Sequence, residues 1–292
     1  MQAREAAYAL TGLSIADTGN PITTYHQIGG RRTVFNTVLA VPSHLNASSP
    51  TSGDAPWNSL EHVVIPPLAA DSGEAASVGE HVQATDEIYY IHQGRGMLTT
   101  NGVPSVVSAG TLVIAPKGTC HRIENTFSGE LLAFLVIELH APTGSASHQP
   151  VVIESLPSAE AGGLQALLGV QPVPLRVSRI DLAGYFSAPW GECSVIQLPP
   201  GARIADYTLP TQDENLFVAE GFATIFVADV RIDPPDDGGH RNVVVPWDVP
   251  RRIVNNSSSD LLTILSVRVH RQVAGLAHTR ADQEVVGTAA HL

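Results

Sequence analysis

The sequence is poor in cysteine, in lysine and in charge of either sign. Its 292 residues include two cysteines, Cys120 and Cys193, too few for a disulfide framework or a four-thiolate zinc site. Lys117 is the only lysine, and Lys and Arg form no cluster, so the phosphate contacts that supply most nucleic-acid affinity are missing. Charged residues make up 15% of the chain, and 16 basic against 28 acidic side chains give a net charge of −12. We therefore expect no nucleic-acid partner.

Long apolar runs are also missing. No stretch reaches the roughly 18 consecutive apolar residues that a transmembrane helix needs. Residues 1–20 lack the basic and apolar regions of a secretory signal. These absences predict a cytoplasmic protein without a membrane partner that acts on small molecules or proteins. The 43% of hydrophobic residues still allow a sizeable core, and the length predicts about two domains.

Short apolar runs recur along the chain between turn residues. They are rich in Val, Ile and Leu and are bounded by Gly, Pro, Asn or Ser, which is the pattern of strands in an all-β barrel or sandwich. Two segments, 159–169 and 274–286, have a helical pattern instead, and we expect short helices there. The expected strands lie within residues 33–41, 61–67, 87–94, 111–116 and 131–139.

The chain contains an internal repeat. The aligned segments are 81–102 with 208–229, at an offset of 127, and 114–139 with 244–269, at an offset of 130. Two collinear matches predict that the chain consists of two copies of one β domain. We place the boundary near residue 150, with an N-terminal domain at 1–150 and a C-terminal domain at 151–292.

Two groups of residues in the first copy follow fixed spacings. His81, Gln83 and Glu87 lie at positions i, i+2 and i+6, so a strand would place all three side chains on one face. Gly94 follows seven residues after Glu87. The second group is Gly110, Pro116, Gly118, His121 and Asn125.

Both groups resemble the paired motifs of the cupin superfamily. The sequence departs from the first motif at Gln83, where the family has a second histidine, and at Ala75, where it has a glycine. The resemblance covers residues 59–140 and, with degraded motifs, about 190–270. It implies an all-β bicupin with two β-barrel or jelly-roll (double-stranded β-helix) domains and a few short helices.

The resemblance also implies a divalent metal held by His81, Glu87 and His121. Gln83 is either a fourth ligand, through its amide oxygen, or a hydrogen-bond partner of substrate or water. Two histidines and one carboxylate suit Fe(II) oxygen chemistry, so we expect Fe(II) first, with Mn, Ni, Co or Zn as alternatives. Tyr89 and Gln83 are the candidate catalytic residues beside the metal, although packing alone would also account for Tyr89.

In the second copy the metal ligands are replaced. The positions of His81, Gln83, Glu87 and His121 are aligned with Thr208, Pro210, Glu214 and Arg251. Because arginine stays protonated, Arg251 cannot ligate a cation. We expect an ion pair between Arg251 and Glu214 in place of the metal, and a structural role for this domain.

The other histidines are predicted to have no part in the site. His92 follows the inward-facing Ile91, so strand alternation points His92 outward and we expect it at the surface. The C-terminal histidines, which are His240, His270, His278 and His291, occupy no ligand position of the motifs.

From the implied metal site we expect an oxygenase, of the dioxygenase type, that acts on a small organic molecule with O₂, in bacterial secondary metabolism. The alternatives are an isomerase, cyclase or lyase that uses the metal as a Lewis acid, and a bicupin that binds a small molecule without catalysis. We also expect a homodimer.

Overall fold

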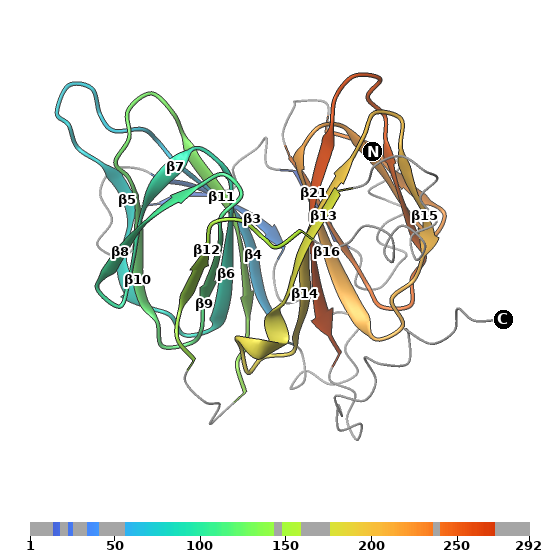
Figure 1. The fold of residues 1–292 in the computed structure, drawn as a ribbon, viewed down its shortest axis with the longest axis horizontal. Coiled ribbons are helices and arrows are strands. Elements are labelled where there is room, and N and C mark those ends of the chain that lie inside the picture. Colours follow the sequence, from blue (N-terminus) through green and yellow to red (C-terminus); the bar gives the residue numbers. More distant parts are fainter. Residues whose placement is uncertain are drawn as a thin grey trace.

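The computed structural model shows two β-barrels that lie side by side, each built from two sheets (Figure 1). The predicted all-β class and the two cupin-like barrels are thus confirmed. The predicted helices at 159–169 and 274–286 lie outside the described residues. Within the described part of the chain, no helix has the length and hydropathy of a membrane span. The structure describes residues 14–17, 23–25, 34–40, 56–142, 148–158, 176–235 and 240–271.

The first barrel packs a seven-stranded sheet, in the order β12-β9-β6-β11-β4-β3-β2, against a four-stranded sheet, β5-β10-β7-β8. Its interior core includes Ile91, Val113, Ile123 and Phe134. The strands are β2 (Thr23–Tyr25), β3 (Val34–Ala40), β4 (Trp57–Ile65), β5 (Ala76–Val82), β6 (Asp86–Gln93), β7 (Arg95–Thr100), β8 (Val103–Ser108), β9 (Leu112–Ala115), β10 (Cys120–Asn125), β11 (Leu132–Leu139) and β12 (Val151–Ile153).

The second barrel packs a six-stranded sheet, in the order β1-β19-β16-β21-β14-β13, against β15-β20-β17-β18. Strand β1, from the start of the chain, joins this barrel, whereas β12 joins the first, so the domain boundary near residue 150 stays a prediction. The elements are β1 (Ser14–Asp17), β13 (Arg176–Asp181), the 3-10 turn η1 (Leu182–Gly184), β14 (Trp190–Leu198), β15 (Arg203–Tyr207), β16 (Gln212–Glu220), β17 (Ala223–Val227), β18 (Val230–Ile232), β19 (Arg241–Val245), β20 (Arg251–Asn255) and β21 (Leu262–His270).

The larger sheets of the two barrels face each other, and a third hydrophobic core fills the space between them. Tyr90 and Leu135 from the first barrel belong to this core together with Trp190, Phe217 and Leu265 from the second. Strand β6 is therefore buried on both faces, because Ile91 points into the first barrel and Tyr90 points toward the second.

Two aspartates at equivalent positions of the repeat join the barrels reciprocally. Asp86 accepts hydrogen bonds from the backbone N–H of Lys117 in its own barrel and of Ala188 in the other barrel. Asp213 accepts one from the N–H of Trp247 in its own barrel and one from the indole N–H of Trp57 across the interface, at 3.2 Å. The barrels are thus related as the repeat predicts, and polar contacts fix their mutual position.

The motif residues shared by both copies have structural roles. Gly94 has φ +72°, and a Cβ atom at this residue would lie 1.9 Å from the carbonyl oxygen of Leu131. Its counterpart Gly221 has φ +84°, and a Cβ atom there would lie 2.6 Å from the carbonyl oxygen of Leu261. Asn125 and Asn255 each donate side-chain hydrogen bonds to carbonyl groups of the loop that follows. At Gly94 and Gly221 glycine is required, because any other residue would place a Cβ atom against the neighbouring carbonyl group.

Candidate functional site

Two of the predicted metal ligands, Glu87 and His121, come together inside the first barrel with His81 beside His121, but the donor atoms of the three do not all lie within 4.8 Å of one another. His81 comes from β5, Glu87 and Tyr89 from β6, and His121 from β10. The antiparallel pairing of β5 with β10 sets His81 opposite His121, and their ring centroids lie 4.4 Å apart. Glu87 and Tyr89 share a face of β6 because their side chains are two residues apart.

Tyr89 links the carboxylate to one imidazole. Its hydroxyl donates to Glu87 Oε2 at 2.8 Å and lies 2.6 Å from His121 Nε2. A hydroxyl carries one proton, so Tyr89 can donate to only one of these two groups at a time, and His121 Nε2 can bind a cation only in the tautomer whose proton is on Nδ1. The imidazole and the carboxylate also lie close to each other, with 3.5 Å between His121 Nε2 and Glu87 Oε2. Both side chains are buried.

The donor atoms of Glu87 and His121 fit a common cation. Two ligands with bonds of about 2.0–2.2 Å in a tetrahedral site lie about 3.3–3.6 Å apart, which matches their separation of 3.5 Å. His81 Nδ1 contacts the carbonyl oxygen of Gly79 at 2.9 Å, so Nδ1 carries the proton and Nε2 keeps its lone pair. Burial and the neighbouring His81 lower the pKa of His121 to about 4, which leaves its imidazole neutral at pH 7.

Gln83 is buried beside these residues, and its amide is already engaged. The amide oxygen accepts from the backbone N–H of Ala84 at 3.0 Å. The side chain also hydrogen-bonds to Glu87, which acts to lower the pKa of that carboxyl. Burial, with the nearby charge of Glu138, outweighs this effect and raises the pKa of Glu87 well above its usual range.

Sequence reasoning missed two carboxylates of this interior. Glu138 lies opposite Glu87 in the β6–β11 pairing and accepts from the hydroxyl of Thr85 at 3.2 Å. Glu61 on β4 also adds to the electrostatic repulsion on Glu87. The repeat carried a signal for the first of them, because Glu138 aligns with Arg268 and the charge at this position therefore differs in sign between the two copies.

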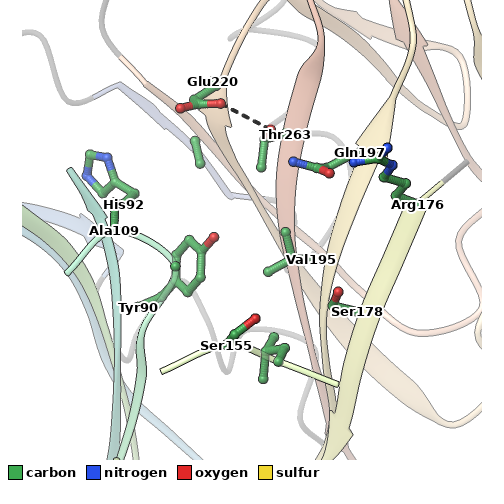
Figure 2. A pocket seen from close by; sticks show the side chains of 13 residues that line it. Tyr90, His92, Ala109, Ser155, Arg176, Ser178, Val195, Gln197, Glu220 and Thr263 are labelled. Carbon is green, nitrogen blue, oxygen red and sulfur yellow. Dashed lines mark hydrogen bonds between the residues drawn. The ribbon is translucent and has the colours of Figure 1, made fainter. Parts of the chain in front are cut away.

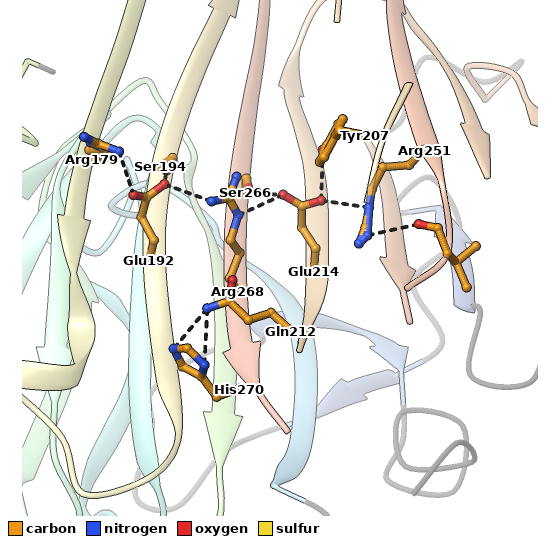
Figure 3. Close-up of polar contacts among 11 residues, drawn as sticks. Arg179, Glu192, Ser194, Tyr207, Gln212, Glu214, Arg251, Ser266, Arg268 and His270 are labelled. Atoms are coloured by element: carbon orange, nitrogen blue, oxygen red, sulfur yellow. Dashed lines mark hydrogen bonds and ion pairs between the residues drawn. The ribbon is translucent and has the colours of Figure 1, made fainter. Parts of the chain in front are cut away.

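The second barrel has a permanent cation at the equivalent place (Figure 3). Arg251 Nε lies 3.2 Å from Glu214 Oε2, and both side chains are fully buried, which confirms the expected ion pair. Arg268 Nε approaches the other carboxylate oxygen at 3.3 Å. Hydroxyl groups of Tyr207 and Ser266 donate to the same carboxylate, at 2.9 and 2.6 Å. Burial alone would raise the pKa of Glu214, but Arg268 and Arg251 outweigh burial and lower it.

One alignment in the second copy was wrong by one residue. Tyr207 pairs with Arg251 as His81 pairs with His121, so Tyr207, and not Thr208, stands at the position of His81. The ladder between β15 and β20 has an irregular register just before this residue. A fixed offset cannot follow such a shift.

A cavity of about 280 Å³ lies between the two barrels (Figure 2). Its lining includes Tyr90 and His92 from the first barrel and Arg176, Gln197 and Glu220 from the second. The expected surface position of His92 is therefore wrong. Strand alternation does point His92 away from the first barrel, but the second barrel covers that face and leaves the side chain only 9% exposed.

The comparisons with known proteins agree with this architecture. Residues 70–138 match the family model of the cupin domain, and a search of curated proteins finds no match to the chain. A putative glyoxylate-induced protein from Pseudomonas aeruginosa is 15% identical, with a TM-score of 0.64 over 91% of this chain and 92% of that chain. AerE from Microcystis aeruginosa is 15% identical, with a TM-score of 0.61 over 88% and 99%.

Oxalate decarboxylase from Bacillus subtilis, which has Mn(II) centres, is 14% identical and has a TM-score of 0.53 over 89% of this chain and 78% of that chain. At these identities the likeness concerns the fold. Residues 70–138 therefore form a cupin domain, and the chain as a whole has the fold of a bicupin.

Proposed function

We propose that the chain is a metal-dependent enzyme whose active site is the interior of the first barrel. His81, Glu87 and His121 would hold a divalent cation there. The observation that carries this proposal is the buried pair of donor atoms, Glu87 Oε2 and His121 Nε2, at 3.5 Å. Burial makes the Glu87 carboxylate costly to ionise alone, and a cation held between the carboxylate and the imidazoles would offset that cost.

The remaining side chains have distinct roles in this proposal. Tyr89 is positioned to move a proton, because its hydroxyl contacts both Glu87 and His121. Gln83 orients Glu87 through its amide N–H rather than serving as a ligand, because its amide oxygen is engaged by Ala84. The apolar side chains of Ile91, Val113, Ile123 and Phe134 form the wall that excludes water from the site.

For the reaction, we favour an Fe(II)-dependent oxygenase acting on a small organic molecule. Two histidines and one carboxylate leave open positions at which Fe(II), when bound, brings substrate and O₂ together and activates the oxygen. The second candidate is an isomerase, cyclase or lyase with a non-redox cation. The Tyr89 hydroxyl favours it, because a group that bridges a carboxylate and an imidazole suits proton transfer within a substrate.

Metal analysis with matched variants tests the proposal. The chain, freed of any affinity tag, is loaded anaerobically with Fe(II), and its metal content is compared with that of His121→Ala and of His140→Ala, where His140 is exposed. We expect His121→Ala to lose one equivalent of metal and His140→Ala to lose none. Equal metal content in wild type and His121→Ala would overturn the site and leave a bicupin that binds small molecules without catalysis.

Whether turnover requires O₂ distinguishes the oxygenase from the isomerase, cyclase or lyase. Fe(II)-loaded protein that consumes O₂ in proportion to added substrate supports the oxygenase. Turnover without O₂, at similar rates with Mn or Zn, supports the isomerase or lyase instead.

A further inference from the structure

Three histidines from both barrels meet at the interface. His62 on β4 and His92 on β6 lie on the face of the first barrel that packs against the second. His240 immediately precedes β19 in the second barrel. Strands β4 and β6 are separated by β11 in the sheet, so the fold brings together residues that are far apart in the sequence.

The imidazole rings are close enough to share one ion. His62 Nε2 lies 2.8 Å from His92 Nε2. The ring of His240 lies 4.5 Å from that of His92 and 5.6 Å from that of His62, measured between centroids. One ring nitrogen of each histidine lies within 4.8 Å of the other two, and among the described residues this holds for no other group of three His, Cys, Asp or Glu side chains.

The hydrogen bonds show which ring nitrogens carry a proton. His240 Nδ1 contacts the carbonyl oxygen of Val218 at 3.0 Å, and since a carbonyl only accepts, Nδ1 carries the proton and Nε2 keeps its lone pair. A carbonyl that fixes the tautomer in this way is the usual outer partner of a metal-bound histidine. Between His62 and His92, a hydrogen bond at 2.8 Å requires that one of the two Nε2 atoms already lacks a proton.

The surroundings favour neutral imidazole. Burial, and then the neighbouring His240, lower the pKa of His62 to about 3, and burial likewise lowers the pKa of His92. The aromatic ring of Phe217 lies 5.3–6.0 Å from all three imidazoles and closes one side of the cluster. Neutral imidazole in a closed, partly apolar setting is the form in which histidine binds transition metals.

The two cavities beside the cluster give an ion access and room for a further ligand. His92 lines the cavity of about 280 Å³ shown in Figure 2, and His240 lines a second one of about 150 Å³. Glu220 lines both cavities and supplies a carboxylate beside the histidines. The Glu220 carboxylate accepts a hydrogen bond from Thr263 and does not lie within 4.8 Å of all three imidazoles, so water would complete the coordination of an ion held there.

We propose that His62, His92 and His240 form a second site that binds a divalent transition metal ion such as Zn²⁺, Co²⁺ or Ni²⁺ and links the two barrels. Three imidazoles with an open fourth position are a known donor set for Zn²⁺. The nitrogens of a tetrahedral site lie about 3.3–3.4 Å apart, so the Nε2 atoms of His62 and His92 separate by about half an ångström when the ion enters. This site is independent of the proposed active site.

The experiment uses the full chain in a His121→Ala background, which removes the proposed site of the first barrel. Zn²⁺ is titrated by calorimetry after chelation and removal of any histidine tag. We expect His121→Ala to bind one equivalent of Zn²⁺ and to melt at a higher temperature in its presence. The double variant His121→Ala/His240→Ala should bind none and show no shift.

A matched pair of variants separates coordination from packing. Both variants are made in the same His121→Ala background. His240→Cys keeps a zinc ligand, whereas His240→Ser, whose side chain is nearly the size of cysteine, offers a much weaker one. We expect the Cys variant to retain Zn²⁺ binding and the Ser variant to lose it, while both melt at similar temperatures without metal. The proposal is overturned if His121→Ala binds no Zn²⁺, or if the Ser variant binds it as tightly as the Cys variant; neither result bears on metal binding at His121.

Discussion

The buried ion pair of the second barrel gives the sharpest stability prediction. In Arg251→Met the fully buried Glu214 loses the guanidinium that lies 3.2 Å away. Removing one partner of a buried pair costs about 3–5 kcal/mol, because a charge is left buried without compensation. Arg268, Tyr207 and Ser266 still contact the carboxylate, so we expect the lower end, about 3 kcal/mol. For a folding unit of about 150–250 residues, a loss of about 3 kcal/mol corresponds to a fall in melting temperature of about 6–12 °C.

The neighbouring residue is a matched control. Arg252 carries the same side chain, but it is one-third exposed and lies 3.8 Å from an exposed Asp206, so Arg252→Met should cost less than about 1 kcal/mol. The measurement is urea unfolding followed by tryptophan fluorescence, to which Trp190 and Trp247 of the second barrel and Trp57 of the first contribute. If Arg251→Met costs no more than Arg252→Met, the ion pair does not take the place of a metal in stabilising this barrel.

Three other perturbations follow from the structure. Gly94→Ala should lower the unfolding free energy by about 2–4 kcal/mol, because its Cβ would overlap the Leu131 carbonyl at φ +72°; Gly118→Ala, where φ is +90° in open space, should cost about 1–2 kcal/mol in the same urea titration. The folded-state pKa of Glu214 lies below its unfolded value of 4.5, so its stabilisation is complete above that pH and is lost as the pH falls through the folded pKa; the difference in unfolding free energy between wild type and Glu214→Gln should therefore shrink below pH 4.5. Tyr89→Phe should keep the metal content of the first barrel, measured by elemental analysis, while turnover falls about 10²-fold or more because the bridging hydroxyl is lost.

The fold could be predicted from the sequence because several residues of the repeat have the same structural role in both barrels. Asp86 and Asp213, like Asn125 and Asn255, perform the same hydrogen bonding in each barrel. Such residues fix loops and turns, so their spacing survives even where the chemistry of the barrel changes. This is why the repeat could be identified although the residues aligned with His81, Gln83 and His121 differ in the second copy.

The packing between the barrels could not be predicted in the same way. Strand alternation gave the correct face for His92, but it does not tell what covers that face. One signal was present in the sequence, since Ile88 and Tyr90 alternate with Tyr89 and Ile91 and β6 is thus apolar on both sides, which is typical of a strand buried on two faces. His62 and His240 gave no such signal, because only the docking of the barrels brings them together.

The two barrel interiors differ in the charge that surrounds a buried glutamate. Each buries a glutamate at the same place on its central strand, Glu87 in the first barrel and Glu214 in the second. In the second barrel Arg251 supplies a permanent positive charge and lowers the pKa of that carboxyl together with Arg268. In the first barrel the position of Arg251 is His121, which is neutral at pH 7, so no charge offsets Glu87 there and its pKa rises. A cation from outside would do for Glu87 what Arg251 does for Glu214, which is why we propose a metal in the interior of the first barrel and not in the interior of the second.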